Sequence, residues 1–71
     1  MAHYISEYQA RRLKWIRVGT DDHWKLWRHL GGVHRNMELA VLDICNAKAE
    51  EDGGVYADVI VPNPHGNPNV T

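Results

Sequence analysis

Short apolar stretches alternate with glycine-containing breaks along the chain, and the spacing of the apolar positions predicts helices over most of its length. Ser6 followed by Gln9 matches a capping box, in which two side chains satisfy backbone groups at a helix start. We therefore expect a helix over residues 6–13. Residues 14–18 remain open between helix and strand, because Trp15, Ile16 and Val18 are of types that favour strands.

Two further helices are expected before residue 52. The first covers residues 22–30, with an acidic start and an end at Gly31-Gly32. The second covers residues 33–51, and its main apolar stripe comprises Val33, Met37, Ala40, Val41, Ile44 and Ala47. Leu39 and Leu42 lie outside that stripe. A helix that is apolar over most of its circumference is buried on more than one face, which predicts contact with another molecule.

A strand is expected at residues 55–61, which are rich in β-branched residues. Its pairing partner is the 15–18 region, the 2–5 segment, or the same strand of a second subunit, because a solitary strand leaves backbone groups unpaired. Residues 62–71 contain three prolines and three asparagines, typical of a flexible tail. The predicted fold is α+β or mostly α: one domain of three helices and a C-terminal strand over residues 1–61, then a Pro/Asn-rich tail.

Because the chain is short, we expect its fold to need stabilisation from outside its own core. With 71 residues the chain buries only about 60% of its unfolded surface. Cys45 is the only cysteine, so no disulfide within the chain compensates. A metal or a partner chain is then the expected supplement. Together with the widely apolar helix at 33–51, this predicts a homodimer.

The sequence carries few features that would direct the protein to a membrane or into a secretory pathway. No apolar run approaches the ~20 residues of a membrane span. The N-terminal residues have neither the basic start nor the apolar stretch of a signal peptide. A single thiol fits a reducing compartment. We expect a cytoplasmic protein that does not contact a membrane.

Charge is divided unequally between the two halves of the chain. Residues 1–35 hold seven Lys/Arg against three Asp/Glu, whereas residues 36–71 hold one against six. The formal charges are therefore +4 and −5. Such a division indicates either an anionic partner for the basic half or attraction between the halves, within the fold or across a dimer.

Candidate chemistry is sparse. The spacing of His23, His29 and His34 does not place them on one helical face, and no Cys-x-x-Cys pair accompanies them. Cys45 falls near the apolar stripe of its predicted helix, in an acidic segment, which favours a buried structural thiol. The two glycine pairs lack the pattern of a phosphate-binding loop. These observations predict no enzymatic activity, no metal site and no cofactor.

Three tryptophans stand among basic residues in the first half of the chain. They can fill a small core, anchor a protein partner, or stack on bases. A short helix at 22–30 cannot bury all its apolar positions in one direction, so we predict a protein-binding surface of Trp24, Trp27, Arg28 and Arg35. The alternative is a nucleic-acid-binding surface of Arg11, Arg12, Lys14, Arg17 and Lys25.

The predicted function follows from these surfaces. We expect a small non-enzymatic binding protein that regulates or inhibits a larger protein by direct contact, as many short chains of phages and mobile elements do. The alternative is a nucleic-acid-binding transcriptional regulator that uses the basic, tryptophan-rich half.

Overall fold

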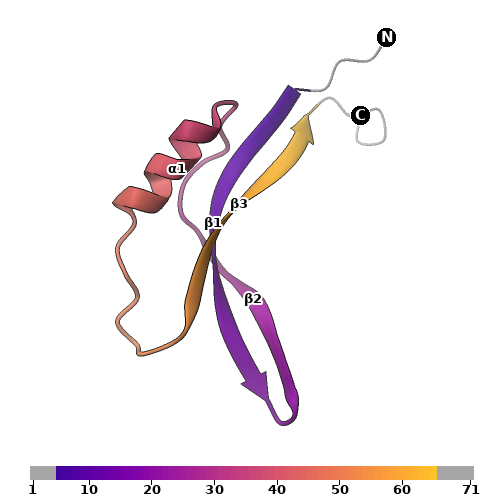
Figure 1. Cartoon of the computed structure of the whole chain (residues 1–71), viewed down its shortest axis with the longest axis vertical. Helices are drawn as coiled ribbons and strands as arrows, with labels where there is room; N and C mark the ends of the chain where they lie inside the picture. The colour runs from indigo at the N-terminus through magenta and orange to yellow at the C-terminus, as the bar shows by residue number, and fades with distance from the viewer. Residues whose placement is uncertain (1–4, 66–71) are drawn as a thin grey trace.

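The protein is mostly β, with three antiparallel strands in one sheet and a single helix (Figure 1). The structure, a computed structural model, describes residues 5–65. The elements follow the order β1 (Ile5–Val18), β2 (Asp21–His29), α1 (Met37–Asn46) and β3 (Tyr56–His65).

The long strand β1 lies at the centre of the sheet, between β2 and β3. Its first ten residues, Ile5–Lys14, pair with β3, and its last eight, Arg11–Val18, pair with β2. The three strands therefore run side by side only around residues 11–14 of β1. Beyond this overlap the β1–β2 hairpin extends alone, at the bottom of Figure 1.

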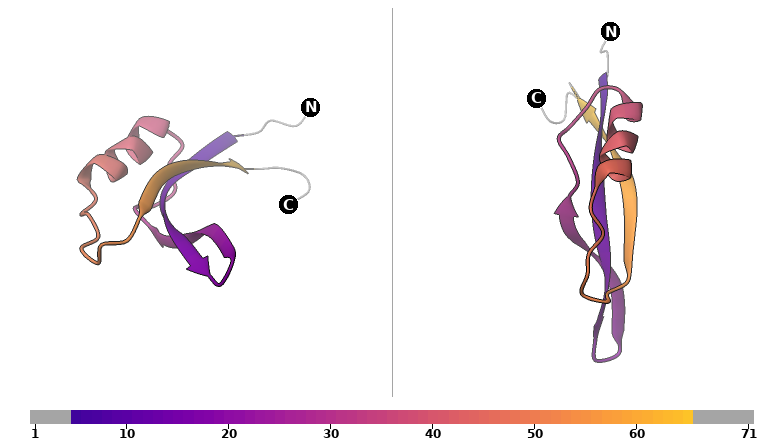
Figure 2. Two further views of the ribbon diagram at one scale, coloured as in Figure 1. Left: turned by 60° about the horizontal axis from the view of Figure 1, so that its bottom comes forward. Right: turned by 90° about the vertical axis from the view of Figure 1, so that its left-hand side faces the viewer.

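The helix α1 covers one face of the sheet only. It contacts β1 and, to a lesser extent, β3. In the left view of Figure 2 the two ends of β1 bend toward the side opposite the helix. We call the covered side the helix face and the other side the open face, because no described element lies over it.

Very little of this single layer is buried. Within residues 7–62 only Ala10, Ala40 and Arg12 are buried, and no large side chain there is completely enclosed. Ala10 and Ala40 contribute little apolar surface because alanine carries one methyl group. The core is therefore two small residues and a charged one.

The predicted fold of three helices and a C-terminal strand is wrong, because residues 6–13 lie in strand β1 and residues 22–29 lie in strand β2. The two strands are joined by the two-residue turn Gly19-Thr20, in which Gly19 has a positive φ of 61°. Glycine at the first position of such a turn is typical of a β-hairpin, not of a helix end alone. The strand alternative for residues 14–18 is confirmed.

The third predicted helix exists but is shorter than expected. It begins after Asn36, whose side chain accepts a hydrogen bond from the Glu38 amide, and ends at Asn46. Residues 47–55 instead cross the sheet without regular structure.

The strand predicted at 55–61 is confirmed as β3, which continues to His65. Its partner is β1 from Ile5 to Lys14. The flexible tail predicted at residues 62–71 overlaps β3 at residues 62–65, and its remaining residues, 66–71, lie outside the described residues.

Gly19 gives a first test of the hairpin. Replacing Gly19 with alanine places a Cβ at a positive φ, although no neighbouring atom obstructs it. We expect Gly19→Ala to lower the free energy of unfolding by about 1–2 kcal/mol. Gly32→Ala is the matched control, since its position is equally open but its φ is not positive, and should change stability by less than about 0.5 kcal/mol. Equal effects measured by urea denaturation would argue against this turn.

Candidate interaction surface

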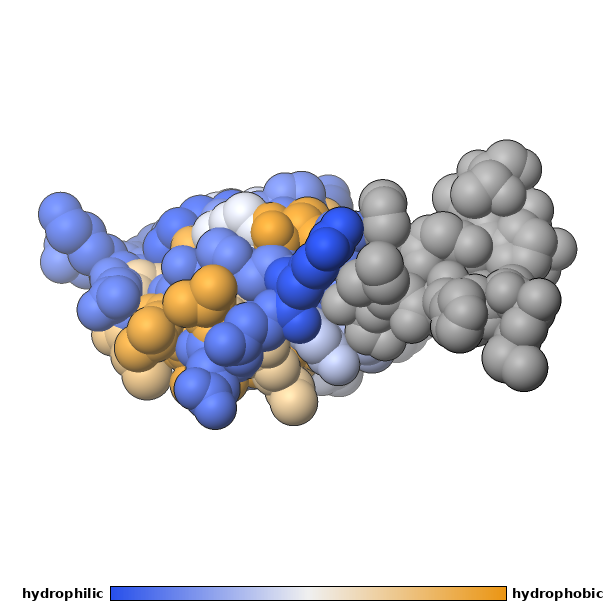
Figure 3. All heavy atoms as spheres, turned by 90° about the horizontal axis from the view of Figure 1, so that it is seen from above, coloured by the Kyte–Doolittle hydropathy of each residue, from blue (hydrophilic) through white to orange (hydrophobic). Residues whose placement is uncertain are grey.

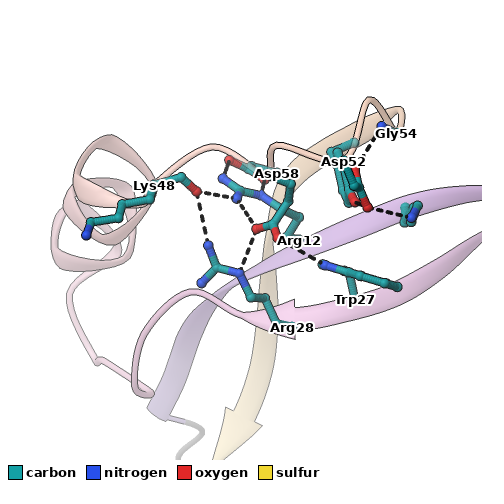
Figure 4. A network of polar contacts seen from close by, with 10 residues as sticks. Arg12, Trp27, Arg28, Lys48, Asp52, Gly54 and Asp58 are labelled. Carbon is teal, nitrogen blue, oxygen red and sulfur yellow. Dashed lines mark hydrogen bonds and ion pairs between the residues drawn. The ribbon is translucent and has the colours of Figure 1, made fainter.

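The helix face is organised around the buried guanidinium of Arg12 (Figure 4). Its Nε and Nη2 donate to the two carboxylate oxygens of Asp58, at 2.7 and 3.0 Å. Its Nη1 donates to the Lys48 carbonyl at 2.6 Å and to Glu50 at 2.7 Å. Bidentate pairing suits the planar guanidinium, and the remaining two contacts engage both protons of Nη1. Arg12 thus fastens β3 and the 47–55 segment to the central strand.

Two residues of β2 join the same network. Arg28 donates from Nε to Glu50 at 2.8 Å and from Nη2 to the Lys48 carbonyl at 3.1 Å, and the Trp27 indole donates to Glu50 at 3.3 Å. Both side chains reach the helix face because β2 carries an extra residue opposite Arg12 and Leu13. Such a β-bulge re-aims side chains locally.

A second cluster lies farther along the helix face. The Lys14 ammonium donates to Asp52 at 2.8 Å and lies 4.3 Å from the centre of the Trp27 ring, a cation–π contact. The Tyr56 hydroxyl and the Gly54 amide also donate to the Asp52 carboxylate. The loop before β3 is therefore held down by its own acidic residue.

These contacts shift the titration of the groups involved. A hydrogen bond from Arg28, followed by one from Arg12, lowers the pKa of Glu50. Arg12 also lowers the pKa of Asp58, and Lys14 lowers that of Asp52. All three carboxylates therefore stay ionised in the folded protein to lower pH than usual. The charges of the helix face are largely neutralised within the chain.

The open face has a different character, which follows from the register of the strands. Successive rows across the sheet are Gln9–Val61, Arg11–Val59, Leu13 with Ala57 and Leu26, Trp15–Trp24, and Arg17–Asp22. The apolar centre of the open face consists of Leu13, Trp15, Trp24, Leu26, Ala57, Val59 and Val61. Polar side chains remain at both ends of the rows.

Two tryptophans dominate this surface. The rings of Trp15 and Trp24 meet edge to face, with centroids 5.2 Å apart. Trp15 is 37% exposed, and Trp24 and Leu26 are each 44% exposed. Within the described part of the chain, these large side chains have only one another to pack against on this side of the sheet. Such an exposed apolar patch is typical of an interaction surface.

Apolar residues also reach solvent on the helix. Figure 3 shows orange apolar groups among blue hydrophilic ones on the side where α1 lies. Met37, Leu39, Val41 and Leu42 are all exposed. The helix is thus apolar over much of its circumference, as its sequence indicates. It buries only Ala40 against the sheet.

The structure separates the residues predicted to form one protein-binding site. Trp24 lies on the open face, whereas Trp27 and Arg28 take part in the network around Glu50 on the helix face. Arg35 is exposed in the segment before α1. The sequence analysis overlooked the other residues of the open face, above all Trp15 beside Trp24. The Gly19-Thr20 turn, which makes these two tryptophans cross-strand neighbours, is the feature that could have revealed them.

The alternative basic surface is divided as well. Arg12 pairs with Glu50 and Asp58, Lys14 pairs with Asp52, and Arg17 pairs with Asp22. Arg11 donates to Gln9, and Lys25 lies across from Lys14 on the β1–β2 pair. These five residues therefore do not form one continuous free cationic patch.

The remaining candidate residues have structural surroundings. His34 lies 2.8 Å from Asp43, a contact that ties the segment before α1 to the helix. Cys45 is exposed on α1, so the expectation of a buried thiol is wrong. Among residues 5–65 no three His, Cys, Asp or Glu side chains group as metal ligands do.

No protein-family model, curated protein or solved structure matches this chain. Within the described part of the chain, no helix has both the length and the apolar character needed to cross a bilayer.

The Arg12 network is tested by removing its cation. Arg12→Met leaves Asp58 without its bidentate partner, so we expect the free energy of unfolding to fall by about 3–5 kcal/mol. Arg17→Met is the control, because the Arg17–Asp22 pair is exposed and should contribute less than about 1 kcal/mol. Urea denaturation of both variants measures the difference. Similar losses in the two variants would contradict the central role of Arg12.

Acid provides an independent test of the same carboxylates. Glu50, Asp52 and Asp58 have lowered pKa values in the folded chain. Their stabilisation is therefore present above the unfolded-state pKa of about 4 and is lost as pH falls through the lower folded values. We expect denaturation midpoints to drop steeply below about pH 4, and less steeply in Arg12→Met. A flat profile down to pH 2 would show that these pairs do not stabilise the fold.

Proposed function

We propose that this chain is a non-enzymatic protein-interaction module that acts by direct contact, with the open face as its binding surface. The observation that carries the proposal is the exposed Trp15–Trp24 pair at the centre of an apolar sheet face. Regulation or inhibition of a larger protein is the role that such a small contact module fits best.

The energetic argument begins with the tryptophans. Each buries 150–250 Å² when fully enclosed, so the exposed parts of Trp15 and Trp24 amount to on the order of 200 Å² of aromatic surface. Tryptophan is enriched among residues that dominate binding energy, especially when it is surrounded by contacts that exclude water. Leu13 and Leu26 adjoin the pair in the next row and enlarge the apolar surface.

A protein partner is favoured over nucleic acid by the distribution of charge. Binding to phosphates depends on cations that are free to replace counterions. Three of the five basic residues considered for this role already pair with carboxylates of the chain. The open face instead presents aromatic and aliphatic groups.

Catalysis has little support from the side chains of the described residues. The carboxylates whose pKa values are lowered are all engaged by Arg12, Arg28 or Lys14. Their lowered pKa values suit ion pairing, whereas general acids and bases operate with values near the working pH. A cytoplasmic location, suggested by the lone thiol, belongs to the same proposal.

The test compares capture of partners by immobilised wild-type protein and two variants. Trp24→Ser removes an anchor of the open face, whereas Leu42→Ser removes a similarly exposed apolar side chain from α1. Partners that depend on the open face, including untagged copies of the chain, should bind Trp24→Ser at least about 30-fold more weakly and Leu42→Ser normally. Circular dichroism confirms that both variants fold.

Two results would contradict the proposal. One is capture that is unaffected by Trp24→Ser. The other is tight binding of DNA or RNA oligonucleotides whose affinity falls steeply with salt, which would favour the nucleic-acid alternative.

A further inference from the structure

We infer that a second copy of this chain covers the open face, with the two sheets stacked face to face and their central strands antiparallel. This inference rests on the proposed function, because it concerns the same surface, but it gives that surface a second copy as its partner in place of a larger protein. It also places the predicted homodimer contact on the sheet, whereas the sequence pattern placed that contact on the helix at residues 33–51.

The shortage of core gives the first argument. With only Ala10 and Ala40 as buried apolar residues, the described chain lacks the apolar burial that stabilises a domain. Whatever covers the open face must therefore be available whenever the chain folds. A second copy is present wherever the chain is made, and its binding stabilises the fold by mass action. Obligate homodimers of this kind have no stable folded monomer.

The order of rows on the open face gives the second argument. The bulky Trp15–Trp24 row lies toward one end, and the smaller Val59 and Val61 lie toward the other. A two-fold axis across the strands near residue 12 reverses the order of rows in the second copy. Because such an axis keeps β1 over β1, Trp15 of each copy then lies over Gln9 of its partner, with Val61 beside it. The bulky indole meets smaller side chains, as close packing between sheets about 10 Å apart requires.

The available area is sufficient for a specific interface. From residue 9 to residue 17, β1 extends for about 27 Å at 3.4 Å per residue, and the strands beside it give a width of roughly 13 Å. This is on the order of 350 Å² per copy in projection. Accessible area exceeds projected area on a surface of protruding side chains, so two copies bury on the order of 1,000 Å². That total lies at the lower limit for specific interfaces.

Isotope-filtered NMR on a mixture of labelled and unlabelled wild-type protein tests the arrangement without disturbing the fold. Within one chain, Trp15 and Val61 lie three rows apart, about 20 Å along β1. Any NOE between a tryptophan ring and the Val61 methyls therefore crosses between copies. We expect these NOEs together with a sedimentation mass of twice 8.1 kDa.

A matched pair of variants locates the contact. Leu26→Asp introduces a charge on the open face, and Leu42→Asp introduces one on a similarly exposed position of α1. We expect Leu26→Asp to raise the dissociation constant of the dimer by roughly 100-fold, because it buries an unpaired charge. Leu42→Asp should leave the dissociation constant of the dimer within about twofold of the wild-type value.

Each outcome decides between the inference and the proposed function. A cooperatively folded monomer at all accessible concentrations overturns the inference, while open-face capture of another protein still supports the function. A dimer that lacks the Trp–Val61 NOEs also overturns the inference. If Leu42→Asp dissociates the dimer and no open-face variant affects any contact, both fail.

Discussion

The buried guanidinium of Arg12 is the interaction on which the rest of this structure depends. It stands in the short region where all three strands run side by side, and it binds Asp58 of β3 together with Glu50 and the Lys48 carbonyl. A buried charge is costly unless it is fully paired, so these partners must be present together. The segment after α1 is fixed over the sheet by this requirement.

The charged network around Arg12 lies on the helix face, opposite the apolar centre of the open face. Arg12, Arg28 and Lys14 are held by Glu50, Asp52 and Asp58 on the helix face. The attraction between the basic and acidic halves of the chain is therefore satisfied internally, one of the two explanations that the charge division allowed. Leu13, Trp15, Trp24 and Leu26 lie opposite, on the open face, where the described chain offers no cover. This division is the physical basis for proposing a binding surface there.

Local sequence signals succeeded where a segment's structure depends mainly on its own residues. The strand at 55–61 combines β-branched residues with flanking breaks, and the helix after Asn36 has a capping side chain. They failed for residues 6–13 and 22–30, where apolar spacing suited a helix but pairing across Gly19-Thr20 produced strands. Backbone pairing between distant segments supplies hydrogen bonds that outweigh weak local propensity.

The sequence by itself determined the strand at residues 55–61, the presence of a helix within residues 33–51 and the scarcity of core. Only the tertiary structure decided that Trp24 lies beside Trp15 on an open face while Trp27 turns to the opposite one. The reason is geometrical. A strand alternates its side chains between two faces, so Trp24 and Trp27, three residues apart, lie on opposite faces, whereas on a helix that spacing would place them on one face. The bulge then keeps Arg28 on the same face as Trp27. Whether the segment forms a strand, and what covers each face, depends on pairing with β1, which residue spacing along one segment does not specify.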